Sequence, residues 1–249
     1  MDRSRPILVI LATLGVIAFN WIAAIGKING TTPEVISDKY PTILTPAGFA
    51  FSIWSLIYVG LIAFSIFQAL PSNAAKFRNI RTVYILSCAL NCAWIYVWHY
   101  DMIAASLIVI CLLLASLLFI NLKLRQTNSY AEYWAAAAPF SLYFGWVTAA
   151  AIVNFAVLLR SQGVNVSLAM GIGGIVLATA LAILVRVKFT NYLYPLAVAW
   201  ALTGIAVKQS GQTLLISAAA VGVIACLIAC CSFVMNLNSS MSPAPNSNE

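Results

Sequence analysis

Residues 102–121 read MIAASLIVICLLLASLLFIN, a stretch without one charged side chain. Its length matches the roughly 20 residues that an α-helix needs to cross the hydrocarbon core of a bilayer. A charged side chain at mid-bilayer costs several kcal/mol, whereas Leu, Ile, Val and Ala are accommodated freely. The stretch therefore predicts a transmembrane helix.

The rest of the chain repeats this pattern. Of its 249 residues, 63% are hydrophobic and only 8% are charged, against about 25% charged residues in ordinary soluble domains. Turn-forming polar breaks separate eight apolar spans, at 7–25, 46–70, 82–98, 102–121, 135–158, 167–187, 191–207 and 213–235. Backbone groups in lipid must be bonded within their own segment, so each span is expected to be a helix. The sequence predicts an all-α polytopic transmembrane bundle of about eight helices.

The basic residues orient this bundle. Eight spans place nine of the thirteen on one side (Arg3, Arg5, Lys76, Arg78, Arg81, Lys123, Arg125, Arg186 and Lys188) and four on the other (Lys27, Lys39, Arg160 and Lys208). The positive-inside rule then predicts an integral protein of the plasma (inner) membrane with both termini cytoplasmic and an uncleaved first helix. The net charge of +7 is attributed to flanks that meet lipid headgroups, so membrane lipid is an expected partner and nucleic acid is not.

The spans lack the residues of several function classes. No charged residue lies near the middle of a span, which argues against proton pumps, ion-coupled carriers and retinal proteins. His99 and Asp101 stand alone at an interface, and the six cysteines lie inside spans, where packing explains them. We therefore expect no enzyme, no metal site and no cofactor. The connection 27–45 is unusually long and proline-rich, which favours a lid.

What remains within the membrane is aromatic and amide. Three spans each carry such side chains at helical spacing: Phe51, Trp54 and Tyr58 on the second, Asn91, Trp94 and Trp98 on the third, and Trp146, Ala150 and Asn154 on the fifth. Trp98, Tyr133 and Trp134 lie near span ends and are expected to be membrane-interface residues. The others fit two explanations: hydrogen bonds between helices, or a pocket for a flat, mostly apolar ligand.

The sequence PTILTPAGFAFSIWSLIY (41–58) resembles the second-helix signature of the TspO/MBR family, the tryptophan-rich sensory proteins related to the mitochondrial translocator protein. Asn91-Cys-Ala-Trp94 resembles its third-helix motif, and Trp146, Ala150 and Asn154 match the spacing of its fifth. The sequence departs from the family at Ile43 and Gly48, which stand where the signature has tryptophans, and at Phe155, where a sterol-recognition pattern needs tyrosine.

The resemblance implies a membrane protein that binds porphyrins or similar hydrophobic small molecules, for sensing, regulation or transport. The ligand-binding residues would be Phe51, Trp54, Tyr58, Asn91, Trp94, Trp146, Ala150 and Asn154. Members have been proposed to degrade porphyrin photochemically, a role that Trp146 would inherit. Two alternatives stay open: a facilitator that moves a neutral or amphipathic solute, and an enzyme acting on a tetrapyrrole or lipid.

The resemblance covers roughly residues 5–160, so we expect three parts. Residues 1–163 form a five-helix TspO-like domain, residues 164–237 a three-helix annex, and residues 238–249 a disordered tail. Small residues dominate the annex helices, which favours close helix packing and possible homo-oligomers over ligand binding. The annex is therefore expected to pack beside the pocket without completing it.

Overall fold

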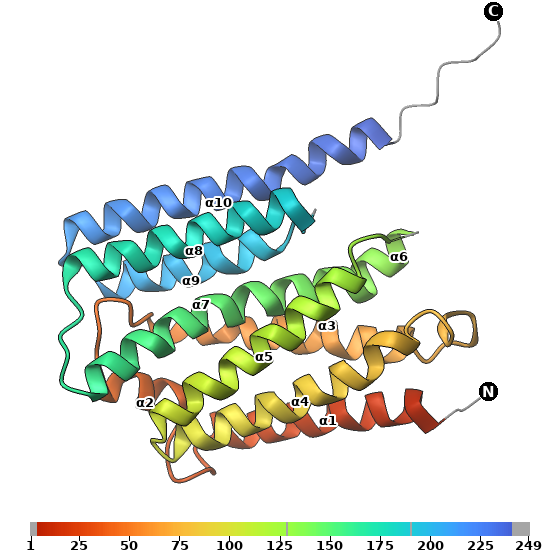
Figure 1. The fold of residues 1–249 in the computed structure, drawn as a ribbon, viewed down its shortest axis with the longest axis horizontal. Coiled ribbons are helices and arrows are strands. Elements are labelled where there is room, and N and C mark those ends of the chain that lie inside the picture. Colours follow the sequence, from red (N-terminus) through yellow and green to blue (C-terminus); the bar gives the residue numbers. More distant parts are fainter. Residues whose placement is uncertain (1–3, 128, 190, 241–249) are drawn as a thin grey trace, which may run out of the picture.

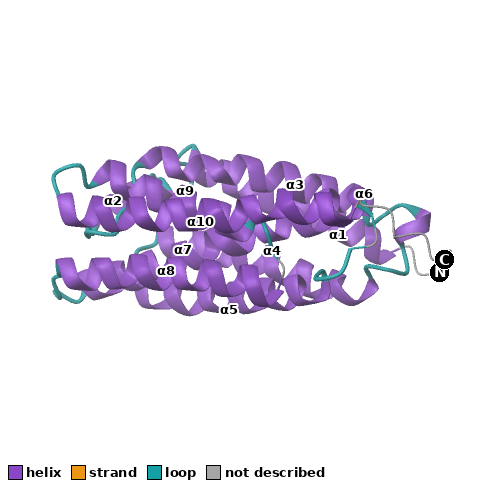
Figure 2. Ribbon diagram, turned by 90° about the horizontal axis from the view of Figure 1, so that it is seen from above, coloured by secondary structure: helices purple, strands orange, loops and turns teal. Residues whose placement is uncertain are grey.

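The computed structural model of the chain describes residues 4–127, 129–189 and 191–240, with side chains as far as Cys231. Its long helices lie side by side along one axis (Figures 1 and 2). The elements in chain order are α1 (Ser4–Ala24), α2 (Pro33–Lys39), η1 (Gly48–Ser52), α3 (Ile53–Phe67), η2 (Pro71–Asn73), α4 (Arg78–His99), α5 (Ile103–Lys123), α6 (Tyr130–Glu132), η3 (Tyr133–Ala137), α7 (Ala138–Ser161), α8 (Leu168–Phe189), α9 (Tyr194–Lys208) and α10 (Thr213–Ser240).

The predicted all-α bundle is confirmed, with one difference in the spans. Within the described ranges, 7 helices are long and apolar enough to cross a membrane. The predicted span 191–207 is α9, a helix of 15 residues, or about 22 Å at 1.5 Å per residue. At the other extreme, α10 continues to Ser240, so residues 238–240 are helical where a disordered tail was predicted. The rest of that predicted tail, residues 241–249, lies outside the described part.

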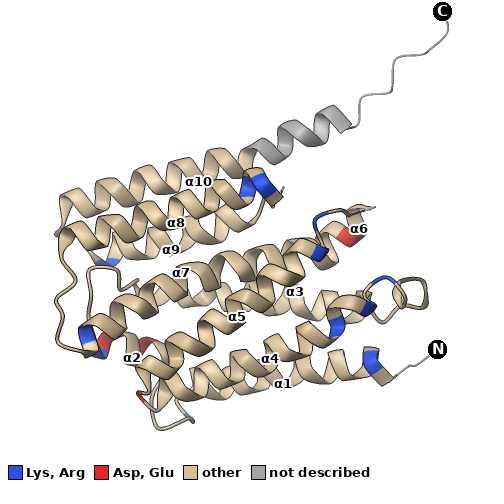
Figure 3. Cartoon of the chain, viewed as in Figure 1, with Lys and Arg blue, Asp and Glu red and all other residues tan. Residues whose placement is uncertain are grey.

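The bundle has a basic end and a mixed end (Figure 3). α1 begins and α10 ends at the basic end, so the chain returns to the side from which it started (Figure 1). Among described residues, this end carries eight basic side chains and one acidic side chain, Glu132, which is buried and paired with Lys76. The mixed end carries four basic side chains and three acidic ones, Glu34, Asp38 and Asp101.

Buried polar bonds join the first helices. The Thr13 hydroxyl of α1 lies 2.5 Å from that of Ser65 and 2.6 Å from that of Tyr84. Two turns further along α1, Asn20 Nδ2 donates to Asn91 Oδ1 at 2.6 Å. These buried groups are bonded to partners on neighbouring helices, which fixes how α1, α3 and α4 are rotated against each other.

α9 lies between α7, on one side, and α8 and α10, on the other. It packs against α7, η1, α8 and α10, and its side chains from Tyr194 to Ile205 are mostly buried. Two glycines permit this approach: a Cβ on Gly145 of α7 would lie 2.5 Å from the Tyr194 carbonyl oxygen, and one on Gly204 would lie 2.7 Å from Ala50 Cβ. The C-terminal helices are thus joined closely to the rest of the bundle.

α7 begins with an irregular turn. η3 is a π-helical turn directly before it, and Pro139 stands in the first turn of α7. Proline has no backbone N–H, so a wider turn upstream accommodates it without a lost hydrogen bond. Gly60 of α3 meets Pro139 so closely that a Cβ there would lie 2.7 Å from the proline Cβ, which sets the spacing of α3 and α7.

Candidate functional site

A narrow cavity, here named the aromatic cavity, opens between α3, α4, α7 and α9 beneath α2. Its volume is about 40 Å³, well below the roughly 300–1,000 Å³ of typical small-molecule pockets. Its walls are overwhelmingly apolar, and the residues are Ser37, Pro46, Phe51, Trp54, Trp94, Trp98, Trp146, Ala149, Ala150, Val153, Asn154, Ala201 and Ile205. A porphyrin-sized ligand requires these walls to move apart.

Six of the eight sequence-predicted site residues line this cavity: Phe51, Trp54, Trp94, Trp146, Ala150 and Asn154. The rings of η1 and α3 meet the ring of Trp146 on α7 edge to face. The ring of Trp146 lies 6.1 Å from that of Phe51 and 6.4 Å from that of Trp54, between ring centres. Helical spacing on separate spans thus brings their aromatic faces together.

Asn154 joins three helices at the cavity wall. Its Oδ1 accepts the indole N–H of Trp94 on α4 at 3.1 Å. Its Nδ2 donates to the Ser106 hydroxyl of α5 at 3.0 Å. The two explanations offered for the membrane asparagines therefore apply together here, because the amide both links helices and holds a cavity tryptophan in place.

Trp146 is different, because its indole N–H has no acceptor among the described residues. The side chain is only 4% exposed. An unbonded buried donor costs about 1–3 kcal/mol, so a ligand that offers an acceptor would gain a hydrogen bond already prepared for it. The Tyr58 hydroxyl nearby is also buried without a partner in the described part of the chain.

Two predicted residues lie outside the cavity wall. Tyr58 stacks behind Trp54, with 5.5 Å between ring centres. Asn91 accepts from Asn20 and donates to the Tyr143 hydroxyl at 2.9 Å, so its amide is used within the bundle. The predicted face of α4 therefore divides: Trp94 contacts the cavity and Asn91 does not.

The expectation that Trp98 is a membrane-interface residue is wrong. Its side chain is 4% exposed and lines the cavity. The ring stacks on Trp94 with centres 5.7 Å apart, and its N–H donates to the Pro33 carbonyl at 3.1 Å. A tryptophan near a span end resembles an interface residue until the lid that covers it is known. Trp134, by contrast, is 53% exposed.

The long connection 27–45 folds over the cavity and is here named the lid. Its centre is α2, capped by the Thr32 hydroxyl, which accepts from the Val35 N–H at 3.3 Å. Lys39 and Tyr40 both bond the carboxylate of Asp101, in the tight turn between α4 and α5. Asp101 adopts a left-handed backbone conformation with φ of 61°, which Asp tolerates better than most residues.

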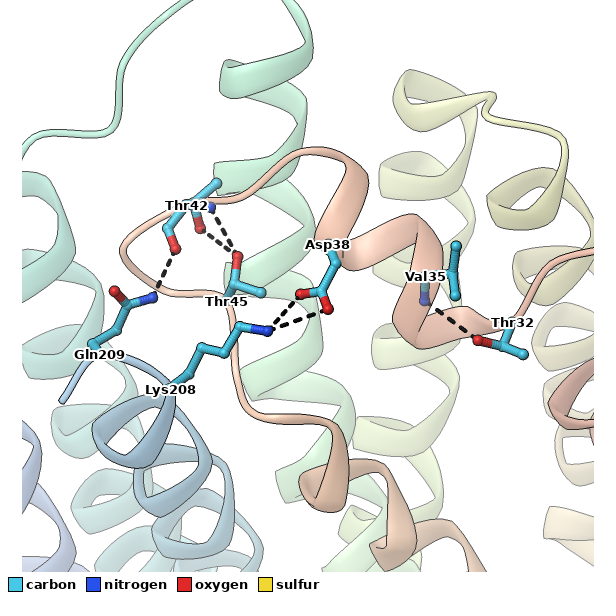
Figure 4. A network of polar contacts seen from close by, with 7 residues as sticks. All are labelled: Thr32, Val35, Asp38, Thr42, Thr45, Lys208 and Gln209. Atoms are coloured by element: carbon cyan, nitrogen blue, oxygen red, sulfur yellow. Dashed lines mark hydrogen bonds and ion pairs between the residues drawn. The ribbon is translucent and has the colours of Figure 1, made fainter.

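α9 holds the other side of the lid (Figure 4). Lys208 Nζ lies 3.0 Å from Asp38 Oδ1, and Gln209 Nε2 donates to the Thr42 carbonyl at 3.0 Å. At the cavity itself, Ala201 and Ile205 of α9 form part of the wall. The expectation that the C-terminal helices leave the pocket uncompleted is therefore wrong.

The residues missed by sequence reasoning are small or plain ones. Ala149, Val153, Ala201 and Ile205 carry no polar or aromatic signal. Ser37 belongs to a connection, and Pro46 is the first residue of a predicted span. Among the described residues, glycines at 145, 204 and 222 mark in the sequence where α9 packs closely against its neighbours.

A second, larger opening of about 390 Å³ lies between α3, α7, α9 and α10. It contains none of the predicted site residues, and its lining includes Leu56, Leu196 and Leu227. The Trp200 N–H at its side is already bonded to the Ala50 carbonyl at 2.9 Å. The groove is mostly apolar, and none of its described lining residues has a buried polar atom without a partner. The aromatic cavity is therefore the better candidate despite its smaller volume.

Comparison with known proteins bears on the whole bundle. The sequence profile of a family described as TSPO-like protein matches residues 6–233. The match extends beyond the stretch of resemblance seen in the sequence and includes α8, α9 and most of α10. No curated protein and no solved structure gives a significant match. The apolar helices and the profile agree, and this integral membrane protein belongs to the TSPO-like protein family.

Proposed function

We propose that the protein binds a flat, largely apolar small molecule of the porphyrin type in the aromatic cavity, for sensing, regulation or transport. The observation that carries this proposal is the buried, unbonded N–H of Trp146 in a wall of aromatic rings. Stacking surfaces with one orienting donor suit a conjugated ligand that carries an acceptor.

The small volume makes ligand binding depend on opening. Two features allow for it: the two ion pairs that join the lid to the bundle are exposed, and Trp54 is only partly buried. Moving α2 away would take Ser37 with it and open the side of the cavity next to Pro46. The bound state is then expected to differ from this one in the position of the lid.

We infer binding without turnover. The side chains that line the cavity include no carboxylate, imidazole, amine or thiol, which are the groups that general acid–base or covalent catalysis uses. The facilitator alternative has less support, because buried rings of Phe64, Tyr84 and Phe140 fill the bundle between the cavity and the basic end. Uptake of a labelled solute by proteoliposomes would test it.

The binding test is a titration of the purified protein with protoporphyrin IX, followed by tryptophan quenching and by the shift of the porphyrin absorption band. Trp146→Phe keeps a ring but removes the donor, so the dissociation constant is expected to rise about fivefold, the equivalent of one hydrogen bond. Trp134→Phe, an exposed tryptophan at the basic end, is the matched control. No saturable binding by the unmodified protein, or equal affinities for both variants, would refute the proposal.

A further inference from the structure

A separate pocket at the basic end has features of a second binding site. It lies where α5 and α8 end and where α7 and α9 begin, and its volume is about 260 Å³. Polar and apolar side chains share its lining, unlike that of the aromatic cavity. The polar side includes Asn121, Arg125, Ser141 and Asn191, and the apolar side includes Leu124 and Phe189. We name it the end pocket.

The floor of the end pocket is held rigidly by buried amides. Asn191 Nδ2 donates to Asn121 Oδ1 at 2.8 Å, and Asn191 Oδ1 accepts the Tyr194 N–H at 3.2 Å. Asn121 in turn donates to the carbonyls of Leu117 and Phe140. These bonds tie α5, α7 and the start of α9 together, so the pocket has a fixed base.

Arg125 lies at the rim. Its Cζ sits 5.5 Å from the ring centre of Phe189, and its Nη2 donates to the Lys188 carbonyl at 3.2 Å. A guanidinium has five N–H donors, so this bond leaves others for an anion. A second guanidinium, that of Arg186, lies 4.0 Å from the ring centre of Tyr192, another pocket residue.

The charge around this pocket is unbalanced. Within the described part of the chain, the carboxylate at this end is that of Glu132, and it is paired with Lys76. Arg125 in the lining, with Arg186 and Lys188 beside it, therefore makes the pocket positive over a polar floor. Figure 3 shows basic residues in blue where α5 and α8 end. Basic pockets between transmembrane helices, at the depth where helices end, are suited to anionic lipid headgroups.

We propose that the end pocket binds the phosphate headgroup of an anionic phospholipid, with Arg125 contacting the phosphate. The volume is suited to a headgroup and is too small for a whole lipid, whose acyl chains would leave the pocket past Leu124 and Phe189 toward the bilayer. The site is independent of the aromatic cavity, which lies toward the opposite end of the bundle.

The test uses the full-length protein, which is delipidated in neutral detergent and then mixed with phosphatidylglycerol or phosphatidylcholine. Native mass spectrometry counts the lipid molecules that each protein retains. Phosphatidylglycerol is expected to be retained in preference to phosphatidylcholine. Arg125→Gln should weaken phosphatidylglycerol retention about fivefold, and Arg125→Lys, which keeps the charge but loses the planar fork, should fall between. Lys123→Gln, two residues away and outside the pocket lining, is the matched control and should retain lipid normally.

Several results would overturn the proposal. Equal loss in Lys123→Gln and Arg125→Gln would indicate a diffuse charge effect, and equal retention of the two lipids would exclude anion selectivity. An Arg125→Gln protein that retains phosphatidylglycerol normally would exclude the contact. A parallel experiment adds inorganic phosphate to the protein with bound phosphatidylglycerol. If millimolar phosphate does not displace the lipid, binding of a lipid headgroup is supported. If phosphate binds and phosphatidylglycerol does not compete with it, the site binds the free anion and the proposal is wrong.

Discussion

At the scale of single residues, two departures from the second-helix signature, Ile43 and Gly48, lie in filled surroundings. Ile43 packs against Gly171 of α8, where an added Cβ would come within 2.5 Å of Ile43 Cγ2. Gly48 faces the carboxylate of Glu34, and a Cβ at Gly48 would overlap it. The space that tryptophans would need at these positions is occupied by α8 and by the lid.

Restoring a signature tryptophan should therefore destabilise the protein. We expect Ile43→Trp to lower the free energy of unfolding by about 1–3 kcal/mol, the range for overpacking a filled site. Thermal unfolding in detergent measures this. Phe49→Trp, at a nearby position that is 43% exposed, is the control and should change little. A stabilised Ile43→Trp protein would show that the contact with α8 is loose.

Asn91 and Asn154 offer a paired experiment that separates packing from binding. Each amide makes two interhelical bonds, so alanine at either position should cost about 1–2 kcal/mol of stability. Only Asn154→Ala should also weaken porphyrin binding, because it releases Trp94 from the cavity wall. Equal loss of affinity in both variants would mean that the effect is transmitted through general destabilisation.

At the scale of elements, the lid is held by two kinds of neighbour. Asp101 belongs to the α4–α5 turn, and Lys208 belongs to α9. The pKa of Lys39 lies above its ordinary value of 10.5, chiefly because its Nζ donates to Asp101. A raised lysine pKa stabilises the folded form below the unfolded pKa and loses that effect as pH rises through the folded pKa. At neutral pH this contact is therefore intact.

Removing the α9 contact should loosen the lid without unfolding the bundle. An exposed ion pair contributes at most about 1 kcal/mol, so Lys208→Gln should leave the unfolding temperature nearly unchanged. Hydrogen exchange of residues 33–39 should become several-fold faster, and ligand association should quicken. Lys27→Gln, an exposed lysine at the same end, controls for charge alone. If exchange stays the same, the Lys208–Asp38 pair does not restrain the lid.

The α7–α9 crossing should be sensitive to a single methyl group. Gly145→Ala would place Cβ 2.5 Å from the Tyr194 carbonyl, and we expect a loss of about 1–3 kcal/mol in stability. Gly15→Ala on α1, where nothing lies within 4 Å, should be neutral or stabilising, since alanine favours helix more than glycine does. Thermal unfolding of the two variants side by side decides the point, and a neutral Gly145→Ala would contradict the tight crossing.

At the scale of the whole molecule, the charge distribution predicts orientation. Among the described residues, eight basic side chains and one acidic side chain lie at the end where α1 begins, which favours a cytoplasmic position for that end. Reporter fusions after Lys76 and at the C-terminus should both report cytoplasm, and fusions after Gly163 should report the opposite side. A C-terminal reporter on the far side would mean that α9 fails to cross.

Truncation tests whether the C-terminal helices are separable. A chain ending at Gly163 lacks Ala201, Ile205 and Lys208, which supply cavity wall and lid contact. We expect such a protein to insert but to lose most of its porphyrin affinity, as measured by the same titration. Retained affinity would restore the view of the last three helices as a side annex, with residues 1–163 as the ligand-binding domain.

The sequence predicts well what a single helix encodes and poorly what depends on its neighbours. The absence of charge marked the spans, and helical spacing placed Trp54 and Trp146 on facing sides. The different roles of Asn91 and Asn154 are decided by partners on other helices, Tyr143 for one and Ser106 for the other. The contribution of α9 could not be predicted, because alanine and isoleucine are equally common on a cavity wall and on a lipid-facing surface.

The shortness of α9 has a consequence for how the chain enters the membrane. A segment of 15 residues is shorter than the roughly 17–25 residues that span a bilayer. Its transfer from the translocation machinery into lipid is therefore only weakly favoured by hydrophobic free energy. α10 follows after only four residues, and its strongly apolar sequence can supply the missing driving force. We therefore expect the last two helices to insert as one hairpin, so that the wall of the aromatic cavity is completed only after α10 has been synthesised.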